Sequence, residues 1–218
     1  MKKEMIGKTV NLILGVMVFT VWILSFFLWR EGALSVTGWE DLKYFTVQSN
    51  LLFGISCLVY AIYRIVVRKG EVSKWLSILK YVSAVGVFVT FTVVITFLGP
   101  LYGYGMMFSG ANLFFHLLIP IFAIIEYVLF SGKISFKETF FAMISPFVYG
   151  VGYLTNCLVN GIGSWETGNR NDWYYFLEWG YGIGVALFVF LIVVAWGLGV
   201  ALWAGNKAAR RIPWEGKE

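Results

Sequence analysis

Six long apolar stretches, separated by short polar segments, make up most of the 218 residues of this chain. A stretch of about 20 apolar residues is long enough to cross a bilayer core of about 30 Å as an α-helix. The connections between the stretches are too short to form a second domain. The pattern therefore predicts a single-domain, all-α, polytopic membrane protein with six transmembrane helices near 9–29, 44–66, 76–98, 111–130, 139–160 and 176–204.

The composition agrees with this pattern. Hydrophobic residues make up 59% of the chain, charged residues only 13%, and the mean hydropathy is +0.77. A soluble domain of similar size has about half apolar and about a quarter charged residues. Cys57 and Cys157 lie inside predicted helices, where we expect them as free thiols, and their spacing does not indicate a metal site. We expect no metal or cofactor.

The basic residues lie mainly on one side of the predicted bundle. The turns that follow the first, third and fifth helices contain only Arg30, Lys43 and Arg170, whereas all other Lys and Arg residues fall on the opposite side. The positive-inside rule then predicts a multi-pass protein of the cell membrane with both termini in the cytoplasm. This orientation and anionic lipid headgroups account for the net charge of +5, so we expect no nucleic-acid partner. The oligomeric state stays open.

Two glycines in the predicted sixth helix, Gly180 and Gly184, are four residues apart. Small residues at this spacing are typical of close packing between membrane helices. We therefore expect a helix contact there.

His116 is the only histidine, and it lies inside the fourth apolar stretch. An ionisable side chain in a membrane helix usually faces a polar interior and takes part in function. Imidazole also titrates near neutrality, which suits proton transfer. His116 is therefore a candidate general base, although a histidine that only bonds water or a carbonyl would give the same pattern.

Polar side chains gather where the second and fourth helices begin. Thr46 and Asn50 are four residues apart and share one helix face, about 6 Å apart along the axis. Asn112 and His116 are stacked in the same way. Because both helices run inward from the outer side, Thr46 and His116 should lie at similar depth. This is the placement that a hydroxyl nucleophile and its base require.

The corresponding chemistry is ester hydrolysis. His116 would accept the proton of Thr46, which attacks an ester carbonyl, and amides would stabilise the oxyanion; the candidate donors are Gln48, Asn50 and Asn112. A third catalytic group is not evident, and the acidic residues on the correct side are Asp41, Asp172 and Glu178. The alternative is structural, because membrane Ser and Thr often bond their own backbone and polar side chains hold helices together.

Lys80 and Glu126 are charged residues inside the third and fourth predicted helices. Glu126 lies ten residues, about 15 Å, below His116. Lys80 enters the membrane at a comparable depth. We expect a structural ion pair between them rather than a proton relay.

Several motifs together resemble the androgen-induced-gene family, which includes the androgen-dependent regulator of tissue factor pathway inhibitor, and related six-helix bacterial membrane proteins. The motifs are Lys43-Tyr44-Phe45-Thr46, the series Asn112, His116 and Glu126, Val151-Gly152-Tyr153, and Trp173 with Phe176-Leu177-Glu178. The resemblance implies a threonine hydrolase that cleaves fatty acid esters of hydroxy fatty acids, with Thr46 as nucleophile and His116 as base. It also implies a membrane lipid or fatty-acid ester as the substrate, and the compact length and short loops favour a bacterial source.

The chain departs from the animal members at three places. Pro120 is one residue closer to the histidine, the Gln48-Ser49-Asn50 run differs, and Asn160 and Gly161 stand where animal members have histidines. The catalytic pair therefore transfers more directly than the substrate does.

Two other functions remain open. One is a substrate-binding membrane subunit of a vitamin or metabolite importer, with a ligand site made by Trp165, Glu166, Trp173 and Glu178. The other is a non-catalytic structural or signalling protein, in which the polar run from Thr46 to Asn50 only fixes helix packing.

Overall fold

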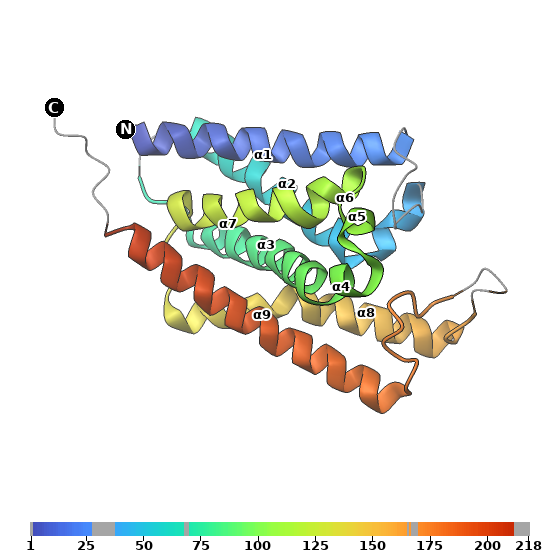
Figure 1. Cartoon of the computed structure of the whole chain (residues 1–218). Helices are drawn as coiled ribbons and strands as arrows, with labels where there is room; N and C mark the ends of the chain where they lie inside the picture. Colours follow the sequence, from blue (N-terminus) through green and yellow to red (C-terminus); the bar gives the residue numbers. More distant parts are fainter. Residues whose placement is uncertain (1, 28–37, 68–69, 165, 167–169, 212–218) are drawn as a thin grey trace.

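The computed structural model describes the chain except for residues 1, 28–37, 68–69, 165, 167–169 and 212–218 (Figure 1). In the described part there are six helices long and apolar enough to cross a membrane, which confirms the all-α fold with six candidate spans. These spans are Lys3–Phe27, Phe45–Val66, Lys74–Tyr102, Ala111–Phe130, Phe136–Asn160 and Tyr181–Ala209.

Several spans change helix type along their length. The first, second and last are continuous α-helices: α1 (Lys2–Phe27), α2 (Phe45–Val66), which follows the 3-10 helix η1 (Gly38–Lys43), and α9 (Tyr181–Ala209). The third span consists of α3 (Lys74–Val93), the π-helical turn η2 (Val94–Leu98) and α4 (Gly99–Tyr102). The short helix α5 (Tyr104–Met107) follows, and the fourth span then consists of α6 (Ala111–Leu113), the π-helical turn η3 (Phe114–Leu118) and α7 (Ile119–Phe130). The fifth span consists of the 3-10 helix η4 (Phe136–Met143) and α8 (Ile144–Asn160).

Helix α3 occupies the centre of the bundle. It packs against α2, α7, α9 and η4. In the span to which α3 belongs, more than half of the most apolar 18 residues are buried. Helix α1 lies along one side of the bundle, against α2 and α7, whereas α8 and α9 lie on the other side (Figure 1). Helix α1 begins and α9 ends at the same end of the molecule, and α4, α5 and α6 lie at the opposite end (Figure 1).

Large apolar side chains cover the outside of the helices. Phe27, Phe147, Leu158 and Phe190 are each more than half exposed, and Val159 is 75% exposed. Exposed apolar side chains in this number suit contact with lipid rather than with water. The fold and its surface together indicate a membrane-embedded protein.

The predicted start of the sixth helix is wrong. Residues 176–180 form turns, and α9 begins only at Tyr181. The reason is local: the buried carboxylate of Asp172 accepts a hydrogen bond from Leu177 N at 3.1 Å, and Gly180 has a φ of +92°, which no helix accommodates. At its other end α9 continues to Ala209, beyond the apolar stretch, and Asn206 in this last part donates to the Tyr127 and Val128 carbonyls of α7.

The expected glycine contact also differs. Gly180 precedes α9, and Gly184 packs against Leu177 and the Phe176 carbonyl, so this pair holds the preceding turn and not another helix. A close helix approach occurs instead at Gly199, where a Cβ would overlap Tyr81 of α3 and Ala142 of η4.

Both cysteines are buried free thiols. Cys57 lies on α2 and Cys157 on α8, in separate apolar clusters.

Candidate active site

Thr46 lies in the first turn of α2 and is only 8% exposed. Its backbone carbonyl accepts hydrogen bonds from Ser49 Oγ at 3.1 Å and from Asn50 Nδ2 at 2.7 Å. Its hydroxyl has no hydrogen-bond partner among the described residues. The side chain is therefore available for another group in this conformation.

Asn50 connects the turn that carries Thr46 with the turn that carries His116. Its Nδ2 donates to the Thr46 carbonyl at 2.7 Å and to the Phe115 carbonyl at 3.1 Å, so both amide hydrogens are used. Asn50 is fully buried, and its Oδ1 has no partner among the described residues. Because an unsatisfied buried donor is costly, this amide fixes α2 against η3.

His116 lies in η3 and is 2% exposed. Its Nδ1 is 2.8 Å from the carbonyl oxygen of Met107, at the end of α5. A carbonyl can only accept a hydrogen bond, so Nδ1 carries the hydrogen, and in the neutral ring Nε2 has the free lone pair. The imidazole is thus held in the tautomer that a general base needs.

A backbone carbonyl takes the place of the expected third catalytic side chain. None of the three acidic candidates bonds His116 within the described contacts. Asp172 is bonded to Tyr153 and Leu177, Glu178 pairs with Arg170 at 2.7 Å, and Asp41 lies in η1 with its Oδ1 unpaired. Sequence reasoning missed the Met107 carbonyl because a backbone acceptor carries no residue-type signal.

The π-helical turn around His116 has a local cause. In a regular α-helix the ring of Pro120 would collide with the carbonyl of His116, four residues earlier. The chain widens instead, and Ile119 N bonds the Phe114 carbonyl, five residues back. The same arrangement occurs before Pro100, where Gly99 N bonds Val94 O. Proline inside an apolar stretch was thus the available sequence signal for both irregular turns.

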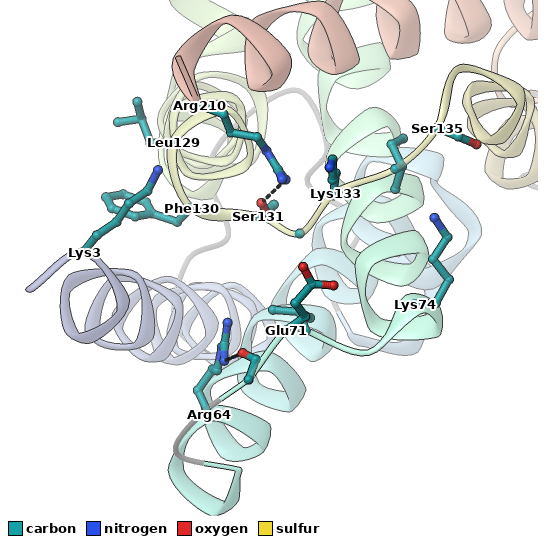
Figure 2. Close-up of a pocket in the computed structure, with 14 residues that line it drawn as sticks. Lys3, Arg64, Glu71, Lys74, Leu129, Phe130, Ser131, Lys133, Ser135 and Arg210 are labelled. Carbon is teal, nitrogen blue, oxygen red and sulfur yellow. Dashed lines mark hydrogen bonds between the residues drawn. The ribbon is translucent and has the colours of Figure 1, made fainter. Parts of the chain in front are cut away.

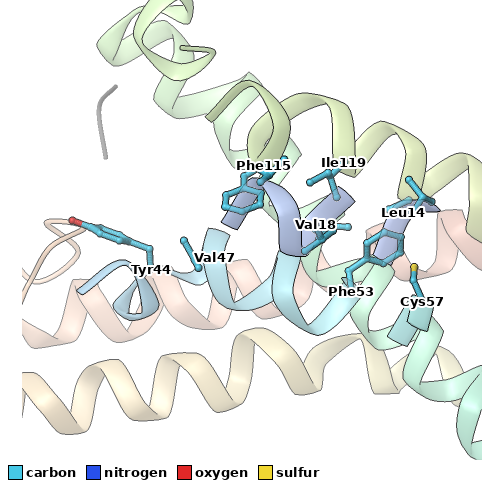
Figure 3. Close-up of a cluster of buried hydrophobic side chains, with 11 residues drawn as sticks. Leu14, Val18, Tyr44, Val47, Phe53, Cys57, Phe115 and Ile119 are labelled. Carbon is cyan, nitrogen blue, oxygen red and sulfur yellow. The ribbon is translucent and has the colours of Figure 1, made fainter. Parts of the chain in front are cut away.

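Apolar packing holds the first turn of α2, which carries Thr46, and η3, which carries His116. Figure 3 shows Phe115 and Ile119 of the fourth span beside Val18 of α1 and Phe53 of α2. All four side chains are at most 3% exposed. Asn50 therefore makes a polar contact beside a cluster of buried apolar side chains, where a hydrogen bond is strong.

Thr46 borders a narrow cavity of about 80 Å³, here called the Thr46 cavity. Side chains from α2, α3, η2, α8, α9 and the preceding segment line it, most of them apolar: Phe45, Thr46, Val89, Thr90, Val93, Val94, Phe97, Leu98, Pro146, Tyr149, Tyr174, Phe176, Phe188 and Leu191. The volume is well below the roughly 300 Å³ of a small-ligand pocket. His116 does not line it, and no hydrogen bond joins His116 to Thr46 in the described contacts.

The remaining oxyanion candidates are separated. Gln48 is exposed and its Nε2 donates to the Leu42 carbonyl at 2.6 Å, so it lies away from the face of Thr46 and Asn50. Asn112 is 6% exposed, one turn before His116, and its side chain has no partner among the described residues. Of the three amides, Asn112 is the one whose two amide hydrogens are both without a partner among the described residues.

Aromatic residues cover the start of α2. The Tyr174 hydroxyl accepts from Phe45 N at 2.9 Å, and Tyr149 donates to the Lys43 carbonyl at 2.7 Å. Trp173 donates to the Tyr149 hydroxyl and packs edge-on against Tyr44. The segment before α9 is thus tied over the mouth of the site.

The structure describes three of the four residues of the importer hypothesis, and no hydrogen bond or ion pair joins these three to one another. Trp173 is part of this aromatic cover, Glu178 pairs with Arg170, and Glu166 is exposed. Trp165 lies outside the described residues.

Lys80 and Glu126 are brought together at full burial. Lys80 Nζ lies 2.7 Å from Glu126 Oε2, and both side chains are inaccessible. Asn11 of α1 completes the pair: it accepts from Lys80 at 2.8 Å and donates to Glu126 at 2.7 Å. Lys80 also contacts Cys57 Sγ at 3.2 Å. Sequence reasoning missed Asn11, although it is a polar residue within the first apolar stretch.

Comparisons of the chain with protein-family models, curated proteins and solved structures return no match. Within the described residues, no group of three His, Cys, Asp or Glu side chains is placed to hold a metal ion. The family resemblance stays a prediction from the sequence, and the functional argument rests on the geometry above.

Proposed function

We propose that this protein is an intramembrane hydrolase of lipid esters, such as fatty acid esters of hydroxy fatty acids. Thr46 is the nucleophile and His116 the general base. We place the protein in the cell membrane with both termini in the cytoplasm, as the distribution of basic residues predicts. The site then opens near the outer leaflet.

The observation that carries this proposal is the amide of Asn50. It joins the turn of Thr46 to the turn of His116 through hydrogen bonds of 2.7 and 3.1 Å. Thr46 lies one helical turn, about 6 Å, outward of Asn50. The same Nδ2 atom contacts the carbonyls of Thr46 and Phe115, so these two residues lie at a similar level along the bundle. His116 follows Phe115 directly, and the side chains of both parallel helices lean the same way, toward the helix N-terminus.

In the reaction, Nε2 of His116 accepts the Thr46 proton as the hydroxyl oxygen attacks the ester carbonyl. The tetrahedral intermediate collapses to an acyl-threonine, and the alcohol leaves with the proton from His116. Water then attacks the acyl group with His116 again as base, and the Thr46 oxygen recovers a proton. Asn112 supports the oxyanion, because the amide hydrogens of Asn50 are engaged by backbone carbonyls.

The apolar Thr46 cavity fits the acyl side of such a substrate. Part of its lining also reaches the outer surface of the bundle: Phe97 lines the cavity and is 55% exposed. An acyl chain can therefore enter sideways from the bilayer. At about 80 Å³ the cavity holds only part of a chain, so binding must widen it.

The test is hydrolysis of a branched fatty acid ester and of a simple lipid ester by purified protein in detergent. Thr46→Ala removes the nucleophile. His116→Asn keeps a donor for the Met107 carbonyl but removes the Nε2 acceptor. Ser56→Ala is the matched control, since it removes another buried α2 hydroxyl, one that bonds Phe53 O and Ser83.

We expect both site variants to lose at least about 100-fold in kcat with unchanged melting temperatures, whereas Ser56→Ala retains activity. Hydrolysis that survives in folded Thr46→Ala, or that is absent from the wild-type protein on both esters, overturns the proposal.

A further inference from the structure

A second and larger cavity lies at the end of the molecule where α1 begins and α9 ends. Its volume is about 670 Å³. We call it the basic pocket, and Figure 2 shows the residues that line it: Lys3, Arg64, Gly70, Glu71, Val72, Lys74, Leu129, Phe130, Ser131, Gly132, Lys133, Ile134, Ser135 and Arg210. This volume lies within the range of roughly 300–1,000 Å³ that small-molecule sites occupy.

Positive charge dominates this lining. It contains five basic side chains and one acidic side chain, Glu71. Two of the basic groups are paired with carboxylates at the edge: Arg64 with Glu4 at 2.9 Å, and Lys74 with Glu138 at 2.5 Å. The pocket therefore keeps a net positive charge even after these pairs are counted.

Arg210 and Lys133 supply charge that no described carboxylate neutralises. Arg210 Nη2 donates to the Ser131 carbonyl at 2.9 Å, and its Nε donates to the Asn206 amide oxygen at 2.9 Å, so both partners are neutral. Lys133 is exposed and forms no ion pair with a described residue. Arg210 is also close enough to Lys3 for the two charges to interact. An anion among these cations would relieve their repulsion.

The pocket has the shape of a headgroup site. Arg210 and Arg64 stand on opposite sides of it (Figure 2). Leu129, Phe130 and Ile134 add an apolar side to the lining. Guanidinium groups bind phosphate with directed, charge-assisted hydrogen bonds, and the apolar side suits the first carbons of acyl chains.

We propose that the basic pocket binds the phosphate of an anionic phospholipid headgroup. The charged residues place this end on the cytoplasmic side, where anionic lipids attract basic segments. Free phosphate shares this recognition chemistry, but the apolar lining favours the lipid. The site is separate from Thr46 and does not depend on the proposed reaction.

Binding would act on the core through Ser131. The Ser131 carbonyl accepts from Arg210, and its hydroxyl lies 3.4 Å from Glu126 Oε1. A ligand that orders Arg210 therefore supports the segment that leads to the buried ion pair. Thermal stability is accordingly a readout of occupancy.

The experiment measures melting of the full-length protein in detergent during titration with phosphatidylglycerol, phosphatidylcholine or inorganic phosphate. The pocket variant is Lys133→Gln/Arg210→Gln. The matched control is Lys137→Gln/Lys207→Gln, which removes two exposed lysines near the same end that do not line the pocket. Native mass spectrometry counts retained lipids in each sample.

We expect phosphatidylglycerol to stabilise the wild-type protein at lower concentrations than phosphatidylcholine does. The pocket variant should need about tenfold more lipid, and the control less than about threefold more. Stabilisation by inorganic phosphate at equal concentration would assign the site to a soluble phosphate instead. Equal losses in the two double variants, or no preference for phosphatidylglycerol, would overturn the proposal. If the double variant fails to fold, Lys133→Gln alone is titrated in its place. This substitution breaks no ion pair with a described residue, so we expect the variant to fold.

Discussion

At the scale of single residues, Asp41 is an unusual ionisable group at the end of the bundle where α2 begins. It is buried in η1, and its Oδ1 has no partner among the described residues. The pKa of this carboxyl is raised from 3.8 to about 6, mainly by burial; the neighbouring Glu40 adds to the rise, and Lys43 opposes it. The folded protein therefore holds this proton more tightly than the unfolded chain does. Stability should fall as the pH rises from about 4 to about 6 and stay lower above that.

Asp41→Asn keeps the size of the side chain and removes the charge. We expect it to raise the free energy of unfolding at pH 7.5 by about 1–2 kcal/mol, after allowance for solvent screening, and to flatten the dependence between pH 4 and 6. Thermal melting across this pH range measures both effects. Glu166→Gln is the control, because Glu166 is exposed and is not among the groups that shift the Asp41 pKa. A wild-type melting temperature that does not change between pH 4 and 6 would contradict the account.

His116 also shows what residue type can and cannot reveal. A lone ionisable side chain in an apolar stretch was sufficient to select it as a candidate. Its orientation depends on the Met107 carbonyl, nine residues earlier, and that carbonyl is placed by the backbone of α5. Neither a carbonyl nor a path of the backbone is visible in a list of side chains.

At the scale of elements, two prolines determine where the third and fourth spans leave α-helical geometry. η2 precedes Pro100, and η3 precedes Pro120. A π-helical turn rotates the following residues relative to a regular helix, and such turns often occur at functional sites. The η3 turn contains His116 itself, so the direction of the imidazole depends on Pro120.

Pro120→Ala restores the missing N–H and removes the clash with the His116 carbonyl. We expect η3 to relax toward an α-helix, which turns the imidazole away from Met107 and lowers kcat by more than about tenfold, while the melting temperature is kept or raised. Kinetics of ester hydrolysis and thermal melting provide the two readouts. Pro100→Ala is the control, because it relaxes the other π-helical turn, η2. Residues of η2 border the Thr46 cavity, which His116 does not line, so this change should alter KM more than kcat. Equal kcat in wild type and Pro120→Ala would show that the turn has no role in aiming His116.

The spans themselves were predictable because a bilayer requires a long apolar helix and the chain has six such stretches. Their ends were less predictable, since they depend on specific contacts. The last helix begins at Tyr181 because Asp172 holds the preceding turn through Leu177 N, and Asp172 is buried by contacts from α8. Hydropathy alone does not contain that information.

At the scale of the whole molecule, the buried network around Lys80 joins four helices. Asn11 lies on α1, Cys57 on α2, Lys80 on α3 and Glu126 on α7. Lys80 Nζ also lies 4.7 Å from the centre of the Phe53 ring. Burial of two charges is costly, but these charges neutralise each other and the amide of Asn11 occupies an oxygen of Glu126.

Removal of one charge should therefore be worse than removal of both. We expect Lys80→Met to lower the free energy of unfolding by about 3–5 kcal/mol, because Glu126 then loses its ion-pair partner in the core. The double variant Lys80→Met/Glu126→Leu should recover most of this loss. Thermal or denaturant unfolding in detergent measures both, with Lys137→Met as an exposed control. A double variant as unstable as the single one would show that the two residues do not act as a pair.

The position of this network along the chain also bears on how the protein is made. Synthesis proceeds from the N-terminus, so α3 enters the bilayer with Lys80 before α7 enters it with Glu126. At that moment the helices already present can offer the ammonium group two neutral contacts, Asn11 and Cys57, which it makes in the final structure. Because Lys80 lies near the start of α3, its long aliphatic side chain can also place the ammonium group near the lipid headgroups. The charge of Lys80 is neutralised only when α7 brings Glu126 into the bundle. That ion pair then joins the third and fourth spans to the first two.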